Sequence, residues 1–119
     1  MIRNIIIKES DFIDIVNKLF LEQESDYTRI RRESVDKIYD IIDNISNSLL
    51  DRDFDGALGE VVVLHTAITT LSQNTRSQTR IDQLRRFASN LERRIERRDM
   101  NGINMQLENI LDILPKFSR

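Results

Sequence analysis

The sequence predicts an all-α fold, a bundle of four or five helices built from two tandem helical hairpins and an N-terminal helix. Apolar residues recur in steps of three and four along most of the chain, which is the packing pattern of helix bundles. One proline and three glycines leave long stretches free of helix breakers. The segments RDFDG at 52–56 and RDMNG at 98–102 place two of those glycines in the same setting, 46 residues apart.

The similarity between the two segments extends along the chain on both sides. A shift of 46 residues aligns Val35 with Ile81, Ile38 with Leu84, Ile45 with Leu91, Val61 with Leu107, Leu64 with Ile110 and Ile68 with Leu114. Similarity at a fixed offset indicates a duplicated helix–turn–helix unit that cannot bury its apolar face alone. We therefore predict that residues 35–71 superpose on residues 81–117, and that the two units pack on each other.

A single helical domain is expected over residues 1–119, because a chain of 14.0 kDa is large enough for one hydrophobic core. Within it, residues 1–34 form an N-terminal arm and helix. Residues 35–75 form the first hairpin and residues 78–117 the second.

The first residues predict an apolar arm. It carries Ile2, Ile5, Ile6 and Ile7. Four helical stripes already close a core without this arm, and exposed apolar patches commonly mark interfaces. We therefore expect the arm to cover the bundle or to contact a second copy of the chain.

The helix after the arm is predicted to begin at Ser10, a residue type that caps helix N-termini. It carries Phe12, Val16, Leu19 and Phe20 at helical spacing. The polar stretch EQESDYTRIRRES allows a break near Ser25 or Ser34. An unbroken helix is the alternative, because no proline or glycine precedes Gly56.

Four apolar stripes define the remaining helices. Their positions are Val35, Ile38, Ile42, Ile45 and Leu49; Ala57, Val61, Leu64, Ile68 and Leu71; Ile81, Leu84, Ala88, Leu91 and Ile95; and Ile103, Leu107, Ile110 and Leu114. The small polar residues of SQNTRSQT at 72–79 predict a loop between the hairpins. Pro115 is expected to stop the last helix.

The two glycine-containing segments predict tight turns inside the hairpins. Their aspartates, or Asp55 and Asn101 two residues later, can accept hydrogen bonds from the free N–H groups that begin the next helix. An apolar residue after each aspartate, Phe54 or Met100, can cover the turn. The glycines would permit a close approach of helices or an unusual backbone angle. A ligand-binding loop is the functional alternative. The predicted structural turn residues are Asp53, Gly56, Asp99 and Gly102.

Composition excludes several classes of chemistry. The chain has no cysteine and one histidine, so disulfides, thiolate metal sites and thiol nucleophiles are impossible. The carboxylates lack the spacing of a calcium loop or a di-iron motif, and no glycine-rich phosphate loop is present. No apolar run approaches the roughly 20 residues that span a bilayer. We expect a soluble, cytoplasmic protein that is not an enzyme and has no metal, cofactor or membrane partner.

Charge is distributed unevenly along the chain. Residues 9–55 hold 13 acids against six bases, whereas residues 76–98 hold eight arginines, three acids and no lysine. In one interpretation these arginines pair with acids on neighbouring helices. In the other they bind a partner, because the planar guanidinium suits bidentate contact with carboxylate or phosphate. The candidate partner-binding residues are Arg86, Arg93, Arg94, Arg97 and Arg98.

Three partners would suit such a surface: an acidic protein, the acidic face of a second copy in a homo-oligomer, or a nucleic acid. A sequence pI near 5.4 and few aromatic residues near the arginines disfavour nucleic acid. The favoured interpretation is therefore a protein–protein interaction module, such as an adaptor, an inhibitor or a small subunit of a larger assembly. The alternative is a nucleic-acid-associated subunit of a ribonucleoprotein.

A third, less favoured interpretation rests on His65 in VVVLHTAITTL. A single histidine on a bundle helix, with the helix order that surrounds it, resembles the histidine-phosphotransfer domains over about 80 residues. That resemblance implies a reactive imidazole. The family's motif has lysine and glycine soon after the histidine, whereas Ile68, Thr69 and Thr70 stand there in this chain. A histidine at the edge of the core is the structural alternative.

Overall fold

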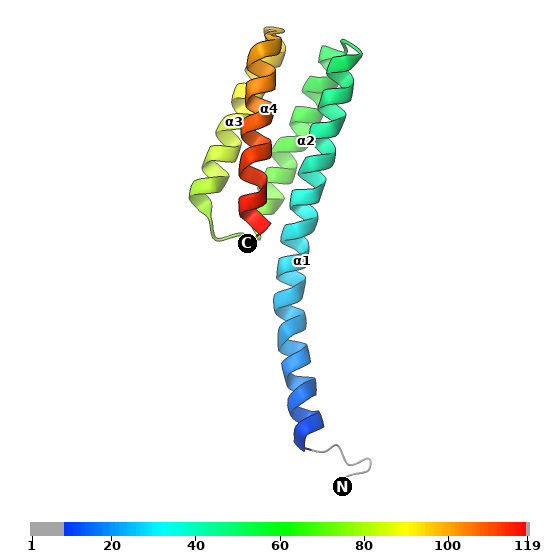
Figure 1. Cartoon of the computed structure of the whole chain (residues 1–119), viewed down its shortest axis with the longest axis vertical. Helices are drawn as coiled ribbons and strands as arrows, with labels where there is room; N and C mark the ends of the chain where they lie inside the picture. The colour runs from blue at the N-terminus through cyan, green and yellow to red at the C-terminus, as the bar shows by residue number, and fades with distance from the viewer. Residues whose placement is uncertain (1–8, 119) are drawn as a thin grey trace.

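The computed structural model describes residues 9–118 of the chain, and the side chains of residues 28–117. Over that range it contains four α-helices and no strand, which confirms the predicted all-α bundle (Figure 1). The helices are α1 (Glu9–Leu50), α2 (Phe54–Ser72), α3 (Gln78–Glu96) and α4 (Met100–Ile113), and a 3-10 helix, η1 (Leu114–Ser118), follows. The predicted arm of Ile2, Ile5, Ile6 and Ile7 lies outside the described residues.

Helix α1 runs without a break through Ser25 and Ser34, so the unbroken alternative is correct. Ser34 is buried and its hydroxyl donates to the Ile30 carbonyl at 2.8 Å, which satisfies the side chain inside the helix rather than at a cap. Ser10 also lies within α1 and is therefore not its N-cap. With 42 residues, α1 is about 63 Å long, and its first half projects beyond the other helices (Figure 1).

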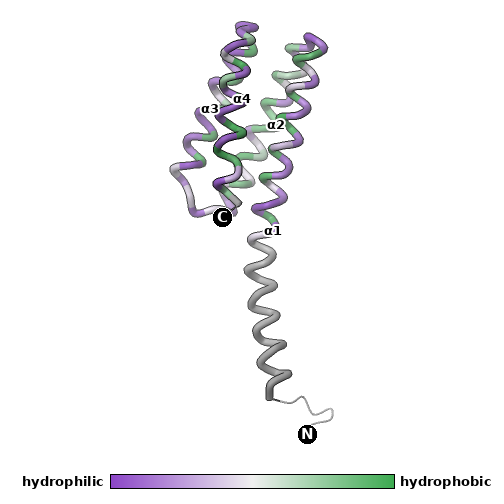
Figure 2. The backbone as a smooth tube through the Cα atoms, viewed as in Figure 1, coloured by the Kyte–Doolittle hydropathy of each residue, from purple (hydrophilic) through white to green (hydrophobic). Residues whose placement is uncertain are grey.

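The helices pack in chain order, α1 on α2, α2 on α3 and α3 on α4, and η1 closes the bundle by contacting both α4 and α1. Apolar residues recur along every described helix (Figure 2). All four predicted stripes are buried, together with Ile41, Ala67, Ile113 and Phe117. The stripes therefore meet in one core, and the outer faces of the helices remain available for polar side chains.

The loop between the hairpins and the C-terminal segment agree broadly with the sequence pattern. The loop between α2 and α3 covers 73–77, inside the predicted 72–79. Helix α4 ends at Ile113, two residues before Pro115, which has no N–H group to donate to the helix. The chain does not leave the bundle there. It continues as η1, which buries Leu114 and Phe117.

The two hairpin turns share one set of contacts. The Asp53 N–H donates to the Ser48 carbonyl at 2.8 Å, and the Asp99 N–H donates to the Arg94 carbonyl at 2.9 Å. Each carboxylate then accepts from the N–H of a glycine, Gly56 at 2.9 Å and Gly102 at 3.1 Å. Asp53 and Asp99, rather than Asp55 and Asn101, are therefore the N-caps of α2 and α4. Superposition of the whole hairpins stays a prediction.

The expected unusual backbone angle in these turns does not belong to the glycines. Arg52 has φ 60° and Arg98 has φ 55°, and no glycine among the described residues has a positive φ. The second residue past each helix, the C′ position, turns left-handed where the chain reverses, and that position holds arginine. The glycines serve close approach instead. A Cβ at Gly102 would lie 2.5 Å from Asp99 Oδ2 and 2.7 Å from Arg94 Cδ.

Candidate partner-binding site

The outward face of α3 carries a stripe that we call the basic stripe. It is opposite the buried Leu84, Leu91 and Ile95. It consists of Arg86, Asn90, Arg93 and Arg97. All three arginines are exposed, and Arg93 donates to the Asn90 side-chain oxygen. From Arg86 to Arg97 the stripe extends about 16 Å along the helix axis, long enough to contact several turns of a facing helix.

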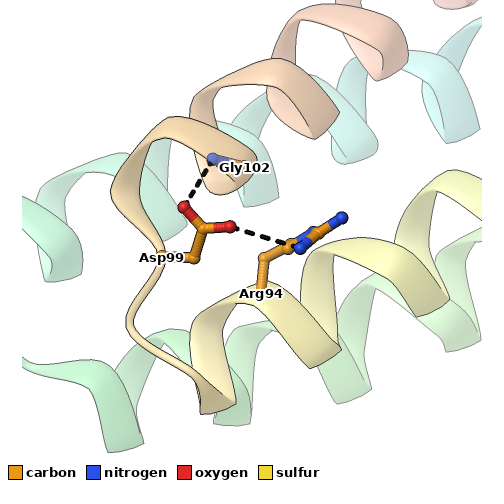
Figure 3. A network of polar contacts seen from close by, with 3 residues as sticks. All are labelled: Arg94, Asp99 and Gly102. Atoms are coloured by element: carbon orange, nitrogen blue, oxygen red, sulfur yellow. Dashed lines mark hydrogen bonds and ion pairs between the residues drawn. The ribbon is translucent and has the colours of Figure 1, made fainter.

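Arg94, although also a predicted partner-binding residue, has a structural contact. Its Nη1 lies 3.3 Å from Asp99 Oδ2, while the other oxygen of that carboxylate accepts from the Gly102 N–H (Figure 3). The arginine therefore holds the N-cap of α4 in place from the last turn of α3. Because the Arg94 and Asp99 side chains are 43% and 38% exposed, water screens this ion pair.

Arg98 also contacts its own chain. Its guanidinium carbon lies 4.9 Å from the centre of the Phe54 ring, a cation–π arrangement. Phe54 opens α2 and is packed against the core, so Arg98 joins the α3–α4 turn to the α1–α2 turn. Met100, which the sequence places in the equivalent position, is exposed.

The remaining arginines of this region bind neutral groups or none. Arg80 Nη1 donates to the Lys116 carbonyl at 2.9 Å, and Arg85 Nη1 is 3.5 Å from Thr69 Oγ1. The side chains of Arg76, Arg86 and Arg97 make no hydrogen bond or ion pair with any residue that the structure describes. Of the eight arginines between residues 76 and 98, Arg94 is thus the one that pairs with an acid in the described part of the chain.

Sequence reasoning did not identify a second charged stripe, which lies on the outward face of α1. We call it the acidic stripe. It consists of Asp36, Asp40, Asp43 and Asn47, all exposed. The three aspartates form no ion pair with another described residue. The signal was present in the sequence, because these residues alternate with the apolar positions Ile38, Ile41 and Ile45 at helical spacing.

The histidine at the α2–α3 contact has an acidic neighbour. His65 Nε2 lies 3.4 Å from Glu92 Oε1, and the two side chains are 35% and 46% exposed. A phosphoryl group on Nε2 would meet this carboxylate, and like charges repel. The position fits a histidine at the edge of the core better than a phosphoryl acceptor.

Other kinds of site have little support in the described residues. No group of three or more histidine or acidic side chains there is arranged to hold a metal ion. Helix α2 is the one described helix that is long and apolar enough to cross a membrane. Its apolar residues Val61, Leu64 and Ile68 are buried in the bundle, whereas Val62 and Val63 are exposed.

Comparison with protein-family models, curated proteins and solved structures found no match to this chain.

Proposed function

We propose that this protein is a non-catalytic interaction module that binds an acidic protein surface through the basic stripe of α3. The observation that supports the proposal most directly is that Arg86 and Arg97 are exposed and have no partner among the described residues. Arginine keeps its charge at every physiological pH and presents a rigid fork of donors to carboxylates. A row of such side chains on a rigid helix favours a facing row of carboxylates over a small ligand.

The proposal assigns different roles to the five candidate arginines. Arg86, Arg93 and Arg97 contact the partner. Arg94 and Arg98 stay with their intramolecular contacts, Asp99 and Phe54, and support the turn that ends the stripe. The roles separate experimentally, because removal of an exposed arginine leaves the core intact, whereas removal of Arg94 frees the cap of α4.

Capture of partners from native lysate, followed by mass spectrometry, tests this proposal. The variant R86Q/R93Q/R97Q is compared with R32Q/R76Q/K116Q, which removes the same charge from exposed positions elsewhere. The proposal expects an acidic protein to be captured by the wild type and by the control variant and to be lost from the stripe variant. Equal capture by both variants would refute it.

A nucleic-acid partner is the second candidate, and the absence of lysine from an arginine-rich stripe favours it over small-molecule ligands. Binding of a single-stranded RNA homopolymer at increasing salt distinguishes the two. For a nucleic-acid binder, the logarithm of the binding constant falls steeply and linearly with the logarithm of the salt concentration, because each phosphate contact releases a counterion. The interaction module proposed here would show weak RNA binding that the control variant and the stripe variant share.

A further inference from the structure

We infer that the acidic surface recognised by the basic stripe is the acidic stripe on α1 of a second copy of this chain. This inference rests on the proposed function and gives its partner a chemical identity. In the interface that we infer, α3 of one copy packs against α1 of the next copy. A different acidic protein is the competing outcome of the test below.

The two stripes have the same spacing along their helices. The basic stripe occupies positions 86, 90, 93 and 97, and the acidic stripe occupies 36, 40, 43 and 47. In order, Arg86, Asn90, Arg93 and Arg97 would face Asp36, Asp40, Asp43 and Asn47. Every pair then joins a donor to an acceptor, and no like charges face each other.

Each stripe lacks ion-pair partners among the described residues of its own chain. Asp36, Asp40 and Asp43 form no ion pair with described residues, and neither do Arg86 and Arg97. A protein whose exposed acids and bases were paired internally would gain little from docking. Here the contacts between copies would be the first ion pairs that these side chains form.

The two stripes lie on opposite sides of the bundle. Helix α1 packs on α2 and η1, and α3 packs on α2 and α4, so α1 and α3 occupy diagonal corners and their outer faces point in opposite directions. A stripe on α3 therefore cannot reach α1 of the same chain. Contact between unlike faces is a heterologous interface, which forms closed rings or open chains instead of a two-fold dimer.

The level of the stripes along the bundle permits this packing by a sideways translation combined with a short slide along the helix axis. Both helices end at hairpin turns with the same contacts, capped by Asp53 and Asp99. Counted back from those caps, Arg86 and Arg97 stand at the levels of Asp40 and Asp51, both exposed acids. A slide of about one helical turn (about 5.4 Å) gives the register described above.

Sedimentation velocity of the full chain over a range of concentrations, at low and at high salt, tests the inference. We expect self-association at low salt that high salt reverses, because screening weakens exposed charge pairs. The variant R86E/R93E/R97E and the variant D36K/D40K/D43K should each associate at least tenfold more weakly, which corresponds to about 1.4 kcal/mol. The control R52E/R76E/K116E changes the net charge as much as R86E/R93E/R97E does, at exposed positions outside both stripes, and should associate like the wild type.

Mixing the two reversed variants is the decisive arm of the experiment. In R86E/R93E/R97E, α3 carries acids and the acidic stripe of α1 stays native. In D36K/D40K/D43K, α1 carries bases and the basic stripe of α3 stays native. An equimolar mixture should therefore regain association that neither variant shows alone. Circular dichroism checks that both variants keep the helical fold.

A wild type that stays monomeric at low salt, or a mixture that does not regain association, would overturn the inference. The proposed function would survive that result if fluorescent poly-L-glutamate still bound the wild type and the control but not R86E/R93E/R97E. A wild type that does not self-associate, together with equal binding of poly-L-glutamate by the wild type, the control and R86E/R93E/R97E, would refute both the inference and the proposed function.

Discussion

Two residues in the hairpin turns adopt a backbone conformation that their side chains disfavour. Arg52 and Arg98 are left-handed at positions where glycine is most common. Such a conformation costs an L-residue about 1–2 kcal/mol. Arg98 recovers part of this cost through the Phe54 ring, and no equivalent contact with a described residue exists for Arg52.

R52G should therefore raise the free energy of unfolding by about 1 kcal/mol, because glycine adopts positive φ without strain. R98G should raise it less, since it also removes a cation–π contact that contributes about 0.5–1 kcal/mol. Urea denaturation followed by circular dichroism measures both. Equal gains would show that the stacking of Arg98 on Phe54 contributes nothing in solution.

The glycines on the helices give a second matched pair. Gly59 has no atom within 4 Å of where a Cβ would lie, whereas a Cβ at Gly102 would press on Asp99 and Arg94. G59A should stabilise the protein by about 0.5–1 kcal/mol through helix propensity. G102A should destabilise it by about 1 kcal/mol, because the capping carboxylate must move. Thermal unfolding of both variants measures these changes in stability. A gain in stability from both substitutions would mean that the cap tolerates the added methyl group.

At this scale the sequence predicted some features and missed others for a physical reason. Asp53 and Asp99 were among the predicted caps, because capping depends on local residue types. The left-handed arginines were not predicted, because the left-handed residue after a helix is normally glycine. The unusual backbone angle was therefore assigned to the two nearby glycines. The Arg98 contact with Phe54 joins residues far apart in sequence, so no local pattern indicates it.

Helix α3 combines a structural side with the side that we propose binds a partner. Arg94 lies beside α4 and holds the α4 cap, whereas Arg86, Arg93 and Arg97 face away from the core. Helical spacing alone is enough to place Arg86, Arg93 and Arg97 away from the apolar stripe, but the division of roles among the arginines depends on the turn geometry. The acidic stripe of α1 was overlooked for a related reason, because attention to clusters of like charge along the sequence misses charges that a helix brings onto one face.

Substitution of these arginines should affect the thermal stability of the protein differently on the two sides of α3. R94Q should lower the thermal midpoint modestly, by an amount equivalent to at most about 1 kcal/mol, because the ion pair is partly exposed. R86Q/R93Q/R97Q should leave the midpoint unchanged, because those side chains contact no acid in the described part of the chain. Differential scanning calorimetry measures both variants. A larger loss from the triple variant would assign its arginines to internal contacts.

Across the whole molecule, the repeat of apolar positions predicted the four helices and their buried stripes. Periodicity did not settle where α1 is continuous, since the polar stretch before Ser34 is compatible with a loop or with an exposed helix. The superposition of residues 35–71 on residues 81–117 remains a prediction about the two hairpins. The charge layout is also a property of the whole bundle, because it separates one basic and one acidic face onto diagonal helices.

The central claim is that the basic stripe of α3 is a binding surface for carboxylates. Its most direct test is the anisotropy of fluorescent poly-L-glutamate titrated with the wild type, with R86Q/R93Q/R97Q and with the control R32Q/R76Q/K116Q. The claim predicts that the stripe variant binds at least tenfold more weakly than the other two, about 1.4 kcal/mol. Equal affinity of the three proteins would contradict it.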